Sequence, residues 1–164
     1  MEQVDTLSRQ VSFATDGSQY LTFRLGDEEY GVEILKVQEI KGYSAITPVP
    51  STPAYVKGVM NLRGTIVPVV DLRAKFGMAE AQYTQFTVII VVMVGAKVMG
   101  LIVDAVSDVL DIPREGIQAT PDFGAEVDAR YISGMAKAGE KLVVLLDIDR
   151  VLGAMDSVEV GHPS

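Results

Sequence analysis

The chain has 164 residues and a formal net charge of −8, from 14 Lys and Arg against 22 Asp and Glu. Hydrophobic residues make up 48% and charged residues 22%, which is too apolar for a disordered chain and sufficient for a core without a metal or disulfide. Cysteine is absent, which excludes disulfides and thiolate sites, and no run of Lys and Arg is dense enough to bind nucleic acid.

The first half is predicted to consist of short β-strands joined by tight turns. Apolar and polar residues alternate from Leu21 to Leu25, the pattern of a half-buried strand, and turn residues at 26–28 precede a strand that starts at Tyr30. A second hairpin joins residues 56–62 to residues 65–70. This half therefore contains two β-hairpins.

Proline and glycine residues refine these elements. Pro68 lies inside a strand, and because it has no N–H it predicts an edge or a bulge there. Thr52 followed by Pro53 is typical of the start of a short helical turn. A short helix is predicted at residues 72–76, ended by Gly77.

The second half repeats this pattern with more apolar strands. Residues 86–94 and 98–103 flank a turn at 95–97, and because their apolar residues occupy both faces, we expect this segment to lie between two packed units. The run at 86–94 is far shorter than the roughly 20 residues that a membrane-spanning helix needs. A further hairpin, with its tip at 138–140, precedes a short helix at 148–152, which Gly153 ends.

The two halves also align with each other. Residues 26–40 align with residues 95–109 at an offset of about 69, and residues 52–77 align with residues 128–153 at an offset of about 76. Matched glycines and a repeated Tyr-x-x-Gly make a chance match of apolar residues a poor explanation. We therefore predict an all-β fold of two small barrels with short helices, produced by an internal duplication.

The alignment also suggests how the chain is divided. We expect a flexible N-terminal tail at residues 1–17, a first barrel-like subdomain at 18–80, a second at 81–155 and a C-terminal tail at 156–164. The pattern leaves open an exchange of strands between the subdomains. Because the N-terminal sequence does not resemble a signal peptide, we expect a cytoplasmic protein.

Residues that could carry catalysis are sparse. The single histidine, His162, lies near the end of the chain, where no rigid element would orient it as a general base. No glycine-rich phosphate loop is present. We therefore predict a protein that is not an enzyme, with no catalytic residue and no cofactor.

Several aspartates have the chemistry to hold a hard cation. Asp104, Asp108 and Asp111 lie close together in the sequence, and Asp147 and Asp149 form a second group. Helix capping explains Asp147, and exposure beside a strand explains Asp104 and Asp108. No metal site is predicted.

Several motifs resemble the CheW family of chemotaxis coupling proteins. The resemblance covers residues 18–153 and is most specific where Asn-Leu-Arg-Gly at 61–64 precedes Pro-Val-Val-Asp-Leu-Arg at 68–73. Its segments are residues 25–31, 34–40, 58–64, 67–73 and 103–110. It implies two SH3-like five-stranded barrels on a shared core, forming one CheW-like domain. It also implies a non-catalytic adaptor that couples chemoreceptor tips to the histidine kinase CheA in signalling arrays.

The resemblance implies where the receptor tip binds. It is expected in a groove between the barrels, at Val37, Glu39, Ile40, Gly58, Arg63, Gly100 and Val109. The glycines would let a helix approach closely, and the apolar side chains would receive its apolar face. A position in the barrel core explains Val37 equally well.

The resemblance implies further partners. The kinase regulatory domain is expected at Tyr43, Ile46 and Thr47, where an exposed Ile46 is otherwise unexplained. Phe123 is expected to form a second array contact, although a core position fits it equally well. Other copies of the coupling protein in array rings are a further expected partner. The chain is expected to join membrane-associated arrays without entering the membrane.

The charge at one hairpin tip is an independent sign of a partner. Arg63 and Gly64 occupy the tip in the first unit, whereas Gly139 and Glu140 occupy the matching places in the second. Because the fold does not need an arginine at one tip only, we expect Arg63 to serve a partner, with Glu39 beside it. An ordinary exposed ion pair is the alternative.

Two other functions stay open at this point. One is a CheW-like domain of another signalling protein, such as a kinase regulatory domain, against which the short tails argue. The other is an acidic metal-dependent enzyme, against which the lack of a base, a nucleophile or a phosphate loop argues.

Overall fold

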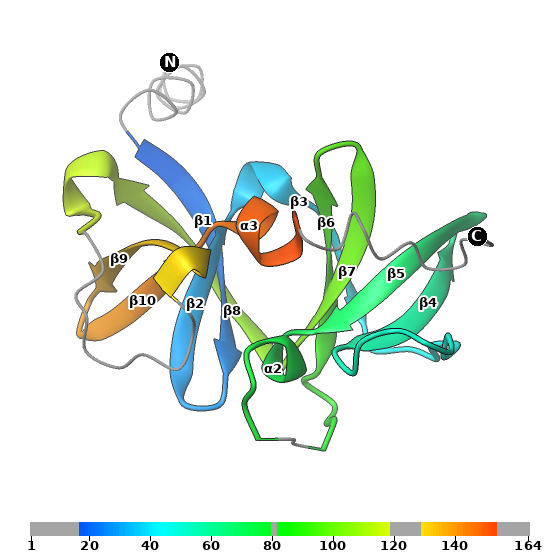
Figure 1. Cartoon of the computed structure of the whole chain (residues 1–164). Coiled ribbons are helices and arrows are strands. Elements are labelled where there is room, and N and C mark those ends of the chain that lie inside the picture. The colour runs from blue at the N-terminus through cyan, green and yellow to red at the C-terminus, as the bar shows by residue number, and fades with distance from the viewer. Residues whose placement is uncertain (1–16, 80–81, 119–128, 154–164) are drawn as a thin grey trace, which may run out of the picture.

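The computed structural model describes residues 17–79, 82–118 and 129–153 and consists mainly of β-strands (Figure 1). The strands form two five-stranded sheets, each of which curls into a small barrel. The two barrels lie side by side, with short helices at their junction. In the described part of the chain, no helix is long and apolar enough to cross a membrane.

Barrel A lies on the left in Figure 1. Its strands are, in order across the sheet, β8 (Ala105–Pro113), β1 (Gly17–Leu25), β2 (Glu28–Glu33), β10 (Lys141–Leu146) and β9 (Ile132–Ala138). Neighbouring strands are antiparallel except for β2 and β10, which are parallel. The short helix α3 (Ile148–Gly153) follows β10, and the 3-10 turns η2 (Arg114–Gly116) and η3 (Ala129–Tyr131) lie between β8 and β9 in the chain.

Barrel B lies on the right in Figure 1. Its strands are, in order across the sheet, β3 (Val37–Gly42), β6 (Val88–Val94), β7 (Lys97–Val103), β5 (Thr65–Asp71) and β4 (Val56–Leu62). Here β5 and β7 are the parallel pair. The helix α2 (Leu72–Lys75) follows β5, and the 3-10 turn η1 (Ile34–Lys36) connects β2 of barrel A to β3 of barrel B.

The two barrels do not coincide with the two halves of the chain. Barrel A combines β1 and β2 from the first half with β8 to β10 from the second, and barrel B combines β3 to β5 with β6 and β7. The contiguous ranges 18–80 and 81–155 therefore do not separate the sheets, because the chain crosses between barrels at η1 and again at Asp104. The expected tails lie outside the described residues, apart from Gly17, which begins β1.

The strand exchange preserves the predicted duplication. Under the two sequence offsets, β1 to β5 correspond to β6 to β10, and this correspondence converts the strand order of barrel A into that of barrel B. The parallel ladders also agree in register: Gly31 lies opposite Leu145 in barrel A, and the equivalent Gly100 lies opposite the equivalent Val69 in barrel B. A shared register is the result expected of two copies of one unit.

Among the described residues, three apolar clusters hold the fold together. The largest lies between the barrels and includes Phe23 and Tyr30, whose rings stack with centroids 6.0 Å apart. Smaller clusters fill the interiors of barrel A and barrel B. Strand β6 contributes Ile90 to the shared core and Ile89 to the interior of barrel B, so its apolar residues are buried on both faces, as the sequence predicted. The all-β prediction with two barrels on a shared core is confirmed.

The helices form where the sequence predicts them, because each has a capping aspartate. Asp71 Oδ1 accepts a hydrogen bond from the Ala74 N–H at 3.3 Å, and Asp147 Oδ1 accepts one from the Arg150 N–H at 3.2 Å. Gly77 has φ of +74° just after α2, a conformation that favours glycine.

One boundary of the predicted elements is wrong, and one predicted turn is present. Strand β6 begins at Val88 rather than Phe86, because the Thr84 hydroxyl accepts from the Phe86 N–H at 3.0 Å and holds the turn before the strand. The short turn predicted after Thr52 is present: the Val56 N–H donates to the Pro53 carbonyl at 2.9 Å, a single turn that leads directly into β4.

Pro68, which has no backbone N–H to donate, lies in a part of β5 that does not pair with β7. It is in β5 opposite Val59 of β4, but the ladder from β5 to β7 begins only at Val69. This end of β5 is therefore a local edge, one of the two arrangements predicted for it.

Candidate functional site

Glu39 and Arg63 form an ion pair on barrel B. Glu39 lies on β3, and Arg63 lies in the turn between β4 and β5. Arg63 Nη2 is 3.0 Å from Glu39 Oε1, and Nη1 donates to Oε2 at 3.3 Å. The arginine is exposed and the glutamate is partly buried, so the pair presents a fixed positive group to solvent.

The backbone of Arg63 is unusual. Arg63 has φ of +51° and Gly64 has φ of +89°, so both residues of this two-residue turn are left-handed, as in a type I′ hairpin. Asn61 Oδ1 accepts from the Gly64 N–H at 2.8 Å and stabilises the turn. A left-handed conformation costs a non-glycine residue roughly 1 kcal/mol or more. Barrel A avoids that cost with Gly139 at the matching place, where φ is +68°.

Two apolar side chains stand exposed at equivalent places on the two barrels. Ile40 on β3 is 44% exposed and Val109 on β8 is 45% exposed, and the two are matched by the sequence offset. Their strands are edge strands of barrel B and barrel A respectively. Val37 is partly buried and packs against the shared core, as does its equivalent Val106. Ile40 and Val109 are therefore exposed on edge strands, and each of these strands also packs one partly buried valine against the shared core.

Gly58 and Gly100 are buried, and the protein's own atoms account for both. Gly58 has φ of +144°, and a Cβ there would collide with the Thr47 carbonyl oxygen. A Cβ on Gly100 would come within 2.9 Å of the Ile89 side chain. Packing within barrel B therefore explains why both residues are glycine. The close approach of a partner helix, which was expected from the sequence, is not needed as an explanation.

The residues expected to contact the kinase lie near one another, with one difference from expectation. Tyr43 is exposed and its ring lies 4.5 Å from that of Tyr83, centroid to centroid. Ile46 is not fully exposed, because it packs against the interior cluster of barrel B. Thr47 pairs its backbone with Val59 through two hydrogen bonds of 2.9 Å, which covers the edge of β4. Phe123 lies outside the described residues.

Sequence reasoning missed two exposed aromatic residues in the segment before β6. Tyr83 packs against Tyr43 with the rings tilted by 51°, and its hydroxyl donates to Asp71 Oδ2 at 2.6 Å. Phe86 is 61% exposed in the turn before β6. The available signal was the position of both aromatics among threonine and glutamine residues, outside any alternating pattern.

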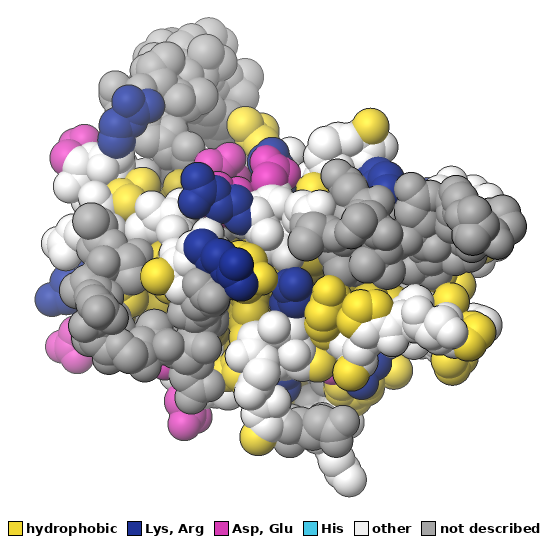
Figure 2. All heavy atoms as spheres, in the orientation of Figure 1, with side chains coloured by type: hydrophobic (Ala, Val, Ile, Leu, Met, Phe, Trp, Pro, Cys, Tyr) yellow, Lys and Arg dark blue, Asp and Glu magenta, His cyan; other side chains and the backbone are white. Residues whose placement is uncertain are grey.

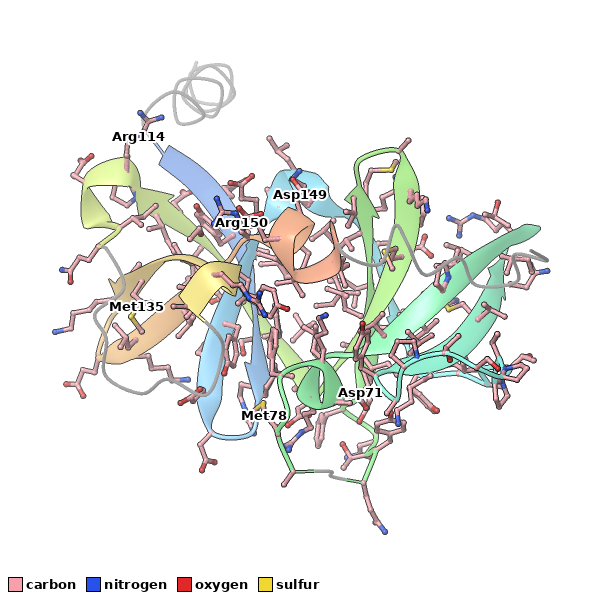
Figure 3. All side chains as sticks on the ribbon, viewed as in Figure 1. Asp71, Met78, Arg114, Met135, Asp149 and Arg150 are labelled. Atoms are coloured by element: carbon pink, nitrogen blue, oxygen red, sulfur yellow. The ribbon has the colours of Figure 1, made fainter. Side chains whose placement is uncertain are left out.

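Asp104, Asp147 and Asp149, three of the carboxylates considered as metal ligands, have other partners. Asp147 caps α3, and Asp149 Oδ2 pairs with Lys36 Nζ at 2.8 Å. Asp149 lies on α3 at the junction of the barrels (Figure 3), where basic and acidic side chains lie next to one another on the surface (Figure 2). Across residues 17–79, 82–118 and 129–153, no group of three or more His, Cys, Asp or Glu side chains could hold a metal ion.

Asp104 forms a short polar contact between the barrels. Its Oδ2 accepts from Arg73 Nη2 at 2.7 Å and from the Gly26 N–H at 2.8 Å, and Arg73 Nε donates to Oδ1 at 2.9 Å. Burial would raise the pKa of Asp104, but the hydrogen bonds from Arg73 and Gly26 outweigh it and hold the pKa below its usual value. The hydrogen bond to Asp104 likewise raises the pKa of Arg73. The network joins α2 to the β1–β2 turn and so fixes one barrel on the other.

Comparison with known proteins agrees with this geometry. Residues 19–155 match the family described as CheW-like domain. The chain is 44% identical over 153 residues to chemotaxis protein CheW of Klebsiella aerogenes, which covers 90% of this chain and 92% of that protein. It is 42% identical over 135 residues to chemotaxis protein CheW of Rhizobium meliloti, covering 82% and 87%.

A solved structure shows the same fold. The scaffolding protein TtCheW from Thermoanaerobacter tengcongensis superposes with a TM-score of 0.77 and 32% sequence identity, covering 83% of this chain and 88% of that one. The sequence profile, the relatives and the structure all cover both barrels. The chain therefore belongs to the CheW-like family and is a chemotaxis adaptor protein.

Proposed function

We propose that this chain is a non-catalytic scaffold that holds chemoreceptor tips and the histidine kinase CheA in one signalling array. The observation that carries the proposal is the Arg63–Glu39 pair, held at a hairpin tip by a backbone conformation that costs stability. Family membership supports the class of function. A strained residue on an otherwise regular fold is expected where a partner uses it.

The receptor is proposed to contact the edge strands at the margin of the shared core. Ile40 and Val109 offer two exposed apolar side chains, and Arg63 offers a positive group that would fix the orientation of a charged partner. Val37 and Glu39 hold this surface in place from β3. Gly58 and Gly100 act from beneath it, through the packing of barrel B.

The kinase regulatory domain is proposed to contact the end of barrel B at Tyr43, with Thr47 close by. The Tyr43 and Tyr83 rings pack at a tilt and are exposed, and such side chains are common in interface centres. Exposed Phe86 precedes Thr87, whose carbonyl accepts from the Tyr43 N–H at 3.3 Å. Ile46 supports this surface from inside the barrel. Phe123 is proposed as a second array contact, and further copies of the coupling protein as array neighbours. These contacts would recruit a cytoplasmic protein to the membrane-associated arrays.

Charge reversal at Arg63 tests the receptor surface. Arg63→Glu should weaken binding to receptor-containing membranes about tenfold, since it places two carboxylates together and removes the positive group. Arg63→Gly removes the charge but suits the left-handed turn, so it should fold at least as well and bind more weakly than wild type. The matched control is Arg114→Glu, an exposed charge reversal on barrel A.

Co-sedimentation with the membranes measures binding, and circular dichroism measures the fold. The proposal stands if both Arg63 variants fold and bind weakly while the control binds like wild type. Normal binding of a folded Arg63→Glu variant would show that the ion pair is an ordinary surface contact.

A further inference from the structure

Barrel A contains a cavity on the side of β2 and β10 that none of the surfaces described above uses. Its volume is about 630 Å³, and it is lined by the β1–β2 turn, by the start of β10 and by Met135 of β9, labelled in Figure 3. This volume is in the usual range for a ligand pocket. The chemistry of its walls indicates what it would accept.

A buried carboxylate lines this cavity. Glu29 is only 9% exposed, and its nearest cation is Lys141 Nζ at 3.9 Å from Oε1, too far for a hydrogen bond. Among the described residues, no side chain donates a hydrogen bond to it at shorter range. Lys141 is itself 71% exposed, so its ammonium group can return to water at little cost. Glu29 is therefore a mostly buried carboxylate that lines the cavity and is paired only with a distant, exposed ammonium group.

The other walls suit a long cationic side chain. Asp27 and Glu28 add negative charge at the β1–β2 turn, and the Glu28 carboxylate is held by the Tyr30 hydroxyl at 2.6 Å. Arg24, opposite Glu29 on β1, adds one positive charge, so with Lys141 the three carboxylates leave the lining with a net negative charge. Met135 and Val144 are apolar, as is Leu142, which is exposed at the rim. An arginine has an apolar stem for such walls and a planar guanidinium that matches a carboxylate with two hydrogen bonds.

Barrel B shows that the fold does not require these charges. The sequence offset of about 69 places Val98 at the position of Glu29 and Ala96 at that of Asp27. Val98 packs against the interior cluster of barrel B, which is the apolar solution of the same position. Barrel A thus has a carboxylate at a position where barrel B buries an apolar side chain. Burying a charge is costly, so stability of the fold does not explain Glu29.

We propose that this cavity is a docking site for an arginine side chain of a partner protein, with Glu29 as the acceptor of its guanidinium. The incoming arginine displaces the Lys141 ammonium and lays its methylene groups against Met135 and Val144. The site lies at the end of β2, apart from the Arg63 turn and from Tyr43 on barrel B, so it adds a contact beyond those of the proposed function.

Nuclear magnetic resonance titration with N-acetyl-arginine amide tests the site on the full chain. N-acetyl-citrulline amide has nearly the same shape without the charge and serves as the matched ligand control. Shift changes are expected at residues 24–30, 135 and 141–144 with the arginine probe only. Glu29→Gln should weaken binding at least fivefold, whereas Glu33→Gln, an exposed glutamate at the other end of β2, should leave it unchanged.

A second variant covers the case in which a change at Glu29 disturbs the barrel. Lys141→Met removes the competing ammonium at an exposed position, so it should strengthen arginine binding at least twofold. The proposal is overturned if both probes give the same shifts, if the arginine shifts spread over the acidic surface, or if Lys141→Met weakens binding.

Discussion

Replacing Asp104 by asparagine tests how the two barrels are held together. Asparagine keeps the shape of the side chain and an oxygen that can accept from the Gly26 N–H, but it removes the negative charge opposite Arg73. The guanidinium is then left partly buried without its counter-charge. The substitution should therefore destabilise the joint between the barrels while leaving each barrel's own hydrogen-bond ladders intact.

The exposure of the pair sets the size of the effect. The Arg73 side chain is 18% exposed and that of Asp104 is 26% exposed, so the pair lies between a buried pair and a surface pair. Breaking a fully buried pair costs about 3–5 kcal/mol, and exposed pairs contribute about 0–1 kcal/mol. An intermediate loss of about 2 kcal/mol follows, which for a chain of this size lowers Tm by roughly 4–8 °C.

The loss should also depend on pH. Because the folded-state pKa of Asp104 lies below its ordinary value of 3.8, the carboxylate contributes stability above that value and loses it as the pH falls through the folded pKa. At about pH 7 wild type should therefore exceed Asp104→Asn by the full amount. As the pH falls below 3.8 and through the folded-state pKa of Asp104, the two free energies of unfolding should converge.

Urea unfolding followed by circular dichroism at several pH values measures both effects. The double variant Arg73→Met with Asp104→Asn should be less destabilised than the sum of the single variants, because each single change already removes the pair. Equal stability of wild type and Asp104→Asn near neutral pH, or a difference that stays constant into acid, would refute this account of the joint.

Three further experiments test local features of the fold. Gly58→Ala should destabilise the protein by about 3 kcal/mol in urea unfolding through its collision with the chain before β4, whereas Gly42→Ala, with open space around it, should change stability by less than about 1 kcal/mol. Lys36→Asp should be partly rescued by Asp149→Lys, with a coupling of about 0.5 kcal/mol in a double-mutant cycle. Arg63→Gly should raise the thermal midpoint or leave it unchanged, and a clear decrease would mean that the arginine stabilises its turn.

Much of the fold could be predicted from the sequence because it depends on local patterns. The alternation from Leu21 to Leu25, the turn glycines and the two capping aspartates each act within a few residues. The strand exchange could not be predicted, since two similar units offer each hairpin equivalent partners in either barrel. Only the path of the chain at η1 and at Asp104 decides between them.

The candidate surfaces were predicted less completely, because the exposure of a side chain depends on neighbours that are remote in the sequence. Arg63 and Glu39 were paired correctly from charge and position. Ile46 was expected to be exposed, but its neighbours inside barrel B come from strands remote in sequence. Gly58 illustrates the same limit, since a glycine required for internal packing and one required by a partner look alike in a sequence.

The most direct test of the coupling role is a reconstitution of receptor-containing membranes, CheA and ATP, with and without this protein. We expect the wild-type chain to sediment with the membranes, to bring CheA with it and to place CheA phosphorylation under receptor control, without itself becoming labelled. If CheA sediments and is phosphorylated equally in the absence of the chain, or if the chain sediments with neither partner, the proposed coupling function is contradicted.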